Sequence, residues 1–151
     1  MSGETPDIER FARFVPLDSG LAVVSVVRKG PSVHTSIANA GVLGHPLTGR
    51  KVVGLVFGGD ARKLRYLREQ RRGTVTLRAG WQWVAAEGPV ELIGPDDPMP
   101  GIDAERLRLL LREIFTAAGG THDDWDEYDR VMAAERRTAM LLSPERIYGV
   151  G

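Results

Sequence analysis

Apolar and β-branched residues dominate two short segments near the start of the chain, residues 21–28 and 32–40, and in the second segment they alternate with polar ones. A period of two is typical of strands. The sequence Lys29-Gly30-Pro31, which separates the two segments, has the composition of a turn. The pattern therefore predicts a β-hairpin.

Further strands are predicted downstream of this hairpin. A Gly- and Pro-rich connection over residues 41–49 leads to Lys51–Phe57, whose continuous apolar run indicates burial on both faces or closure of a barrel. Residues 74–79 and 81–93 have the same strand character. Gly88 interrupts the longer of these two strands, where we expect a bulge or a corner.

Helical spacing takes over in the second half of the chain. Asp103 has the position of an N-cap, and the apolar face that follows it ends at Gly119. A second helix is expected from near Thr121, and residues 138–143 form an expected last strand. About six strands without regular alternation with helices favour a mainly β chain of the α+β class, with antiparallel strands closed into a small barrel and helices at its periphery.

The composition is that of an ordinary globular protein. Of the 151 residues, 42% are hydrophobic and 26% are charged, which is enough for one domain with its own core. We expect a single domain over residues 1–151, with an N-terminal arm or helix over residues 1–18 and a helical segment over residues 103–135 packed on the barrel.

Several classes of function are excluded by composition. The absence of Cys removes disulfides, thiolate nucleophiles and Cys-based metal sites, and it fits a cytoplasmic location. No apolar run approaches the roughly 20 residues that span a bilayer. Because 20 basic residues balance 20 acidic ones, nothing favours a nucleic-acid partner. The three His residues lack the spacing of metal ligands, so no metal site is expected.

Candidate chemistry is clearest where the strand Lys51–Phe57 ends in Gly58-Gly59 and leads into a short helix, which we expect to open with Asp60, Arg62 and Lys63. Free backbone N–H groups and the positive end of the helix dipole attract an anion at such a point. Two cations in the first turn oppose that dipole, which favours a negative group beside them. A phosphate is the best candidate.

The alternative is a solvated basic helix face. The basic run continues beyond the first turn, and cations at the end of a helix complement its dipole without any ligand. A continuous basic track would instead suit a ligand with several anionic groups. Its members are Arg62, Lys63, Arg65, Arg68, Arg71 and Arg72.

Other polar residues have simpler interpretations. His34 lies on a predicted strand, where a packed or surface His is commoner than a catalytic base. The segment His122-Asp123-Asp124 is typical of a helix start with acidic first-turn residues. No Ser lies in a nucleophile elbow, which argues against a serine hydrolase. Tyr66 and Tyr148 are candidate proton donors, but a place in the core or an interface explains them better.

Several segments together resemble the split β-barrel flavin and deazaflavin proteins. They are the hairpin LAVVSVVRKGPSVHTSIAN, the segment ARKLRYLREQRRGTVTL, the strand WQWVAAEGPVELI, the acidic HDDWDEY and the closing SPERIYG. This family includes pyridoxamine 5'-phosphate oxidase and the coenzyme F420-dependent reductases of actinobacteria. The resemblance covers residues 21–149 and implies an FMN-binding-like split β-barrel.

The resemblance also implies a set of site residues. Arg62 and Lys63 correspond to the basic pair that binds the cofactor's phosphate in the family, in agreement with the anion site argued above. Phe57 and Gly58 stand where relatives often have a Thr or Ser beside the phosphate, so backbone N–H groups would replace the hydroxyl. The strands that line the ring in the family correspond here to His34, Thr35 and Ser36, and to Gln82, Trp83 and Val84.

The function implied is hydride transfer from bound coenzyme F420 to an unsaturated small-molecule substrate, at a site on a homodimer interface. The resemblance is the main reason to favour coenzyme F420 over FMN, and the long basic track supports it, because the deazaflavin has a polyglutamate tail with several carboxylates. The alternatives are an FMN-dependent oxidase or reductase, and a non-catalytic cofactor binder or carrier. No catalytic residue is assigned. Apolar strand faces such as residues 84–90 are expected to be exposed and to support the dimer.

Overall fold

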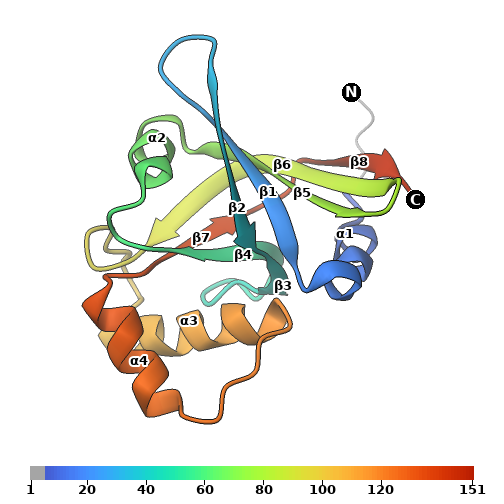
Figure 1. The fold of residues 1–151 in the computed structure, drawn as a ribbon. Coiled ribbons are helices and arrows are strands. Elements are labelled where there is room, and N and C mark those ends of the chain that lie inside the picture. Colours follow the sequence, from blue (N-terminus) through green and yellow to red (C-terminus); the bar gives the residue numbers. More distant parts are fainter. Residues whose placement is uncertain (1–5) are drawn as a thin grey trace.

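The computed structural model describes residues 6–151 (Figure 1). Residues 1–5, at the start of the expected N-terminal arm, lie outside the described part. The rest of the arm forms the helix α1 (Ile8–Phe14) and a 3-10 turn, η1 (Val15–Asp18). Asp7 caps α1 by accepting a hydrogen bond from the backbone N–H of Arg10, and Phe11 and Phe14 anchor the helix in the core.

Every strand pair in the described chain is antiparallel, and the strands follow the order β2-β1-β5-β6-β7-β4-β3 with β8 paired to β6. The strands are β1 (Leu21–Val27), β2 (Val33–Asn39), β3 (Gly41–Gly44), β4 (Lys51–Phe57), β5 (Arg72–Ala79), β6 (Gln82–Ile93), β7 (Thr138–Leu142) and β8 (Arg146–Val150).

The described chain has eight strands, so the expectation of about six is wrong. β3 lies inside the Gly- and Pro-rich connection and pairs with β4 from Gly41↔Gly54 to Gly44↔Lys51. β8 follows Pro144 and pairs with the first half of β6. Both strands are short, so their sequences have too few positions to show strand periodicity. Their stability comes from the hydrogen-bonded ladders with longer neighbouring strands.

β6 connects the two halves of the sheet, and it changes partners at Gly88. The strand pairs with β5 up to Pro89 and with β8 up to Glu87, and from Val90 onward it pairs with β7. A Cβ at Gly88 would lie 2.1 Å from the carbonyl oxygen of Ser143. The expected corner is therefore found here, and the close approach of the next segment explains why the corner residue is glycine.

Three helices complete the described chain: α2 (Arg62–Gln70), α3 (Ala104–Ala117) and α4 (Trp125–Ala134). Asp103 caps α3 as predicted, by accepting from the N–H of Arg106. The second long helix starts later than expected, because Asp124 is its N-cap. α3 and α4 lie together below the sheet in Figure 1, and α2 lies near the β1–β2 hairpin. None of these helices is both long and apolar enough to cross a membrane.

Two hydrophobic clusters lie on either side of β4. Val53 and Leu55 face the barrel interior, where they pack with α1, α2 and the strands around them. Val52 belongs to the second cluster, which β7 shares with α3 and α4. The continuous apolar run of β4 therefore reflects burial on both faces, as predicted.

Candidate functional site

The candidate site begins where β4 passes into α2. Gly58, Gly59 and Asp60 form the turn, and Ala61 is the N-cap, so the helix starts at Arg62 and not at the expected Asp60. No side chain caps this helix, and its first turn contains no acidic residue. The first N–H groups and the positive end of the dipole are therefore not neutralised by the helix itself.

A second turn lies against this one. The last residue of β4, Phe57, pairs with Thr138 at the start of β7, and the N–H of Gly59 donates to the carbonyl oxygen of Glu135 over 3.0 Å. A Cβ at Gly59 would lie 2.7 Å from the Cβ of Arg136, so only glycine allows this approach. Between the turns is a hollow of about 510 Å³, lined by residues 58–60 and 134–137.

Lys63 lies beside these turns. Its Nζ atom is 4.2 Å from the centroid of the Phe57 ring. Burial lowers the pKa of Lys63 below its ordinary value of 10.5, and the positive charge of Arg137 lowers it further. No hydrogen bond or ion pair to Lys63 Nζ is found among residues 6–151. An anion placed here would relieve the repulsion between the two cations.

His34 forms the opposite wall of the site, on β2. Its ring centroid is 5.5 Å from that of Tyr66 on α2, and the Arg28 guanidinium carbon lies 5.9 Å from the Tyr66 centroid. Burial lowers the pKa of His34 below 6.5, and the charges of Arg28, Lys63 and Arg62 act in the same direction. His34 is therefore mainly neutral at neutral pH.

The region where the β1–β2 hairpin meets α2, formed by Arg28, His34, Arg62, Lys63 and Tyr66, is thus strongly basic, and we call it the basic region. Of the ion pairs between described residues, none involves Arg28, Arg62 or Lys63. Arg28 has only a long contact of 3.5 Å to Nδ1 of His34. Cations held together without carboxylates fit a phosphate, which binds several charge-assisted donors at once.

Ser36 adds a polar atom that also lacks a partner. Its Oγ is buried and has no hydrogen-bond partner within the described residues. Ser36 lies on the same face of β2 as His34, whereas Thr35 is exposed on the other face. An unsatisfied buried hydroxyl costs about 1–3 kcal/mol. The residues present therefore fit a ligand that has a phosphate and further polar atoms along β2.

Gln82 and Trp83 do not lie at the basic region within one chain. They begin β6, where Trp83 pairs with Val150 and its ring centroid lies 6.0 Å from that of Tyr148. The other end of β6, at Ile93, pairs next to the Phe57 end of β4. At about 3.3 Å per residue, the intervening strand is roughly 30 Å long.

The predicted site residues thus divide into those near the glycine turn and those that lie elsewhere. His34, Phe57, Gly58, Arg62 and Lys63 lie in the basic region or at the glycine turn beside it, and Ser36 lies on the same face of β2 as His34. Thr35 is on the outer face of the sheet. Val84 is buried in the barrel interior, with 0% of its surface exposed, so it cannot line a ligand site there.

The basic run along α2 is interrupted by two ion pairs. Arg68 donates to both carboxylate oxygens of Asp97, over 2.9 and 2.7 Å, and Arg72 donates to Glu145 over 2.6 Å. These two cations are neutralised within the chain. Arg71 is the C-cap of α2 in a left-handed conformation. The basic group near the glycine turn is consequently more compact than a tail-binding track.

Arg28 and Arg137 are members of the site that sequence reasoning missed. Arg137 immediately precedes β7, and the antiparallel pairing of β7 with β4 places it next to the Gly58-Gly59 turn. The signal was the basic pair Arg136-Arg137 directly before the last predicted long strand. Its use requires knowing which two strands pair, and periodicity alone does not establish this.

Metal ligands do not gather in the part of the chain that the structure describes, where no group of three or more His, Cys, Asp or Glu side chains is found. His45 is buried and lies 2.9 Å from Glu91 through Nε2, and its Nδ1 accepts from the N–H of Leu47. His122 accepts from the N–H of Asp124 at the start of α4. The structure thus gives both residues local structural roles.

Known structures share this arrangement of strands, although no protein-family model matches the sequence. A conserved hypothetical protein of Mycobacterium tuberculosis aligns with a TM-score of 0.67 and 16% identity, over 99% of this chain and 88% of that protein. A pyridoxamine 5'-phosphate oxidase-related, FMN-binding protein of Nostoc punctiforme aligns with a TM-score of 0.67 and 11% identity, over 97% and 84% of the two chains.

A heme storage protein of Vibrio cholerae also aligns, with a TM-score of 0.59 and 9% identity, over 97% of this chain and 96% of that one. Identities this low establish shared architecture and nothing finer. The chain has the mainly antiparallel, α+β split-barrel fold of pyridoxamine 5'-phosphate oxidase-like proteins, a fold that is found with flavin-binding and heme-storing members.

Proposed function

We propose that this protein is an oxidoreductase that binds a phosphorylated flavin or deazaflavin at the basic region between α2 and the β1–β2 hairpin. The observation that carries the proposal is the set of cations without carboxylate partners at the uncapped start of α2. Lys63 is the central member, because it lies beside the glycine turn and its pKa is lowered by burial and by the charge of Arg137.

The residues of the basic region have different roles in binding the cofactor. Lys63 and Arg62 hold the phosphate, together with backbone N–H groups at Gly58 and at the start of α2. Ser36 Oγ donates to or accepts from a polar atom of the ring system, and the neutral His34 packs along it. The bound flavin or deazaflavin supplies hydride transfer to an unsaturated organic substrate, while the protein orients it and excludes water.

Two cofactors remain candidates, and we favour FMN. The compact basic group suits a single phosphate, and an FMN-binding protein is among the proteins with this fold. Coenzyme F420 was favoured by a six-residue basic track, of which Arg68 and Arg72 are engaged in ion pairs. The deazaflavin keeps the support of the sequence resemblance and of Arg65, for which no ion pair is found in the described chain.

A non-catalytic binder is the second candidate function. The heme storage protein of Vibrio cholerae has this fold, so the fold is compatible with binding a large ring without turnover. Tyr66, whose ring contacts His34, is the one candidate proton donor that we assign to the basic region. Turnover of a bound cofactor therefore distinguishes the two functions.

We also propose that the protein works as a homodimer, though not through the surface expected from sequence. Val84 and Val90 are buried within one chain, so the expectation that residues 84–90 are exposed is wrong. The apolar surface is instead on the outer face of the hairpin, where Val23 pairs with Ile37 and Val27 with Val33. All four side chains are exposed, with 62% of Ile37 accessible.

A second copy against this face would bury these side chains. A second copy would also allow Gln82 and Trp83 to contact the cofactor, because residues remote from the basic region of their own chain can reach the basic region of the partner. The cofactor site in this proposal lies at the interface, and its ring-facing wall comes from both copies.

The test is titration of the purified protein with FMN, coenzyme F420 and hemin, followed by reduction assays on enones and quinones. The proposal predicts saturable binding of FMN or coenzyme F420 at one site per chain, with turnover of at least one acceptor. Binding without turnover would favour the carrier. Tight binding of hemin with no binding of either phosphorylated cofactor would contradict the proposal.

A further inference from the structure

A separate cavity lies on the other side of the sheet from the barrel interior. Its volume is about 450 Å³, and it is enclosed by the end of β6, the loop that follows, α3 and α4. This volume is within the range of about 300–1,000 Å³ found for small-molecule sites. Most of its wall is apolar, with Ile93, Pro98, Met99, Leu107, Leu111 and Met132 as the main contributors.

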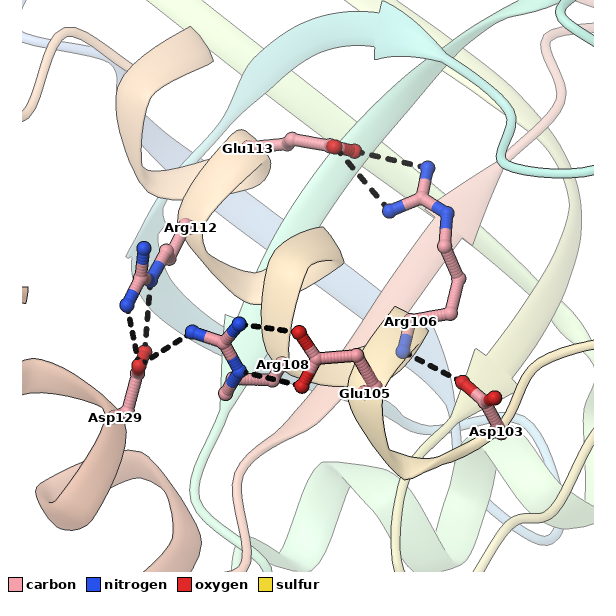
Figure 2. Close-up of polar contacts among 7 residues, drawn as sticks. All are labelled: Asp103, Glu105, Arg106, Arg108, Arg112, Glu113 and Asp129. Carbon is pink, nitrogen blue, oxygen red and sulfur yellow. Dashed lines mark hydrogen bonds and ion pairs between the residues drawn. The ribbon is translucent and has the colours of Figure 1, made fainter. Parts of the chain in front are cut away.

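The charged residues at one wall are already paired with each other. Arg108 donates through Nη1 to Asp129 over 2.7 Å and through Nε to Glu105 over 2.9 Å. Arg112 also donates to Asp129, so that this carboxylate joins the two Arg residues of α3 to α4 (Figure 2). Asp103 is occupied as the N-cap of α3. Arg108, Arg112, Glu105 and Asp129 thus compensate one another's charges.

Arg137 differs from these charged residues in its hydrogen bonding. It also lines the cavity, and its Nε and Nη2 atoms both lie 2.8 Å from one oxygen of Glu135. That ion pair is partly exposed, so it is weak and can be rearranged. Nη1 has no hydrogen-bond partner among the described residues. The cavity therefore has an apolar body and a single Arg with donors to spare.

We propose that this cavity binds an apolar molecule with one carboxylate, of the class of medium-chain fatty acids or aryl carboxylic acids. The hydrocarbon part fills the space between α3 and α4, and the carboxylate accepts hydrogen bonds from Arg137. Arg is suited to this role, because its planar guanidinium binds a carboxylate through two parallel hydrogen bonds. The cavity shares Arg137 with the candidate site at Lys63, but its apolar body lies between α3 and α4 and does not depend on a flavin.

Ala133 and Ala134 on α4 provide a matched pair of variants. Ala133 lines the cavity, whereas Ala134 lines the hollow beside the glycine turn. Both side chains are exposed, so a larger residue is accommodated without breaking the core. Ala133→Phe is expected to fill the cavity, and Ala134→Phe is expected to leave it open.

Decanoate is the probe, with decanol as its uncharged counterpart, and binding is measured by isothermal titration calorimetry on the full chain. We expect decanoate to bind the wild type at least about tenfold more tightly than decanol, the effect of a charge-assisted hydrogen bond. Ala133→Phe should weaken decanoate binding at least about tenfold, whereas Ala134→Phe and Lys63→Ala should retain it.

Equal binding of decanol and decanoate, or equal effects of Ala133→Phe and Ala134→Phe, would overturn the proposal. If Ala133→Phe fails to fold, as judged by its melting curve, Ala104→Phe on the opposite wall serves as a second blocking variant. Because Lys63→Ala removes the proposed phosphate contact and not this cavity, failure of flavin binding and failure of decanoate binding are separate results.

Discussion

The Nζ atom of Lys63 lies 4.2 Å from the centroid of the Phe57 ring, and this contact joins the last residue of β4 to the first turn of α2. A cation over an aromatic face contributes about 0.5–2 kcal/mol, depending on its exposure. Phe57 is itself buried, so its ring is a fixed support. The ammonium is thereby held next to the glycine turn before any ligand arrives, and this reduces the entropy lost on binding.

Removal of Lys63 should weaken binding of a phosphorylated ligand. We expect Lys63→Ala to reduce FMN affinity by about 1.5–3 kcal/mol, the range for hydrogen bonds to charged groups, with little loss of fold stability. Fluorescence titration at low and high salt measures the effect. Arg72→Ala is the control, since Arg72 is paired with Glu145 at the far end of α2. Equal losses in the two variants would mean that the phosphate binds elsewhere.

The pH dependence of binding should carry the signature of Lys63. Its pKa is lowered by burial and by Arg137, so the ammonium loses its proton below the ordinary value of 10.5. The phosphate of FMN is already a dianion above pH 7. Affinity should therefore fall as the pH rises from 7.5 towards 10.5.

The control for this profile is Lys63→Arg, whose side chain stays charged throughout this range. Its affinity should remain flat where that of the wild type falls. The same decline in both proteins would assign the titration to another group.

Gly88 should be far less tolerant of substitution than Gly44. A Cβ at Gly88 would lie 2.1 Å from a backbone oxygen of Ser143, whereas at Gly44 the nearest atom, a backbone oxygen, is 3.4 Å away. We expect Gly88→Ala to destabilise the fold by more than about 2 kcal/mol and Gly44→Ala by less than about 1 kcal/mol. Urea denaturation of both variants tests this, and similar midpoints would show that β6 does not turn tightly at Gly88.

The hairpin face should be the surface through which two copies associate. Ile37→Glu places a charge in the middle of the exposed apolar group on β1 and β2, and we expect it to yield a monomer in sedimentation at low micromolar concentration. Val131→Glu on α4 is the comparison, because Val131 is also exposed but lies away from the hairpin. A wild type that is monomeric at this concentration would refute the dimer.

The long elements of the fold were predictable because each has a strong local signal. Lys51–Phe57 has the predicted bounds, and Asp103 is the N-cap of α3 as expected. β3 was missed because four residues give too few positions to reveal a period. β8 was missed because it is held by the ladder to β6 and not by its own sequence.

The part of the site that is formed by consecutive residues was predictable from the sequence. The turn at Gly58-Gly59 and the cations Arg62 and Lys63 are consecutive in sequence, so their proximity needs no tertiary information. Arg137 is separated from Lys63 by 74 residues in the sequence, and the pairing of β7 with β4 brings it to the glycine turn. The ion pair of Arg68 with Asp97 likewise depends on tertiary packing, which the basic run alone does not reveal.

Comparison of FMN with riboflavin tests the central claim most directly, because the two ligands differ only in the phosphate. Equilibrium titration of the wild type and Lys63→Ala with both ligands gives the contribution of the phosphate in each protein. The account predicts that the wild type binds FMN at least about tenfold more tightly than riboflavin, and that Lys63→Ala removes most of this difference. Equal affinity of the wild type for FMN and riboflavin would contradict a phosphate site at the start of α2.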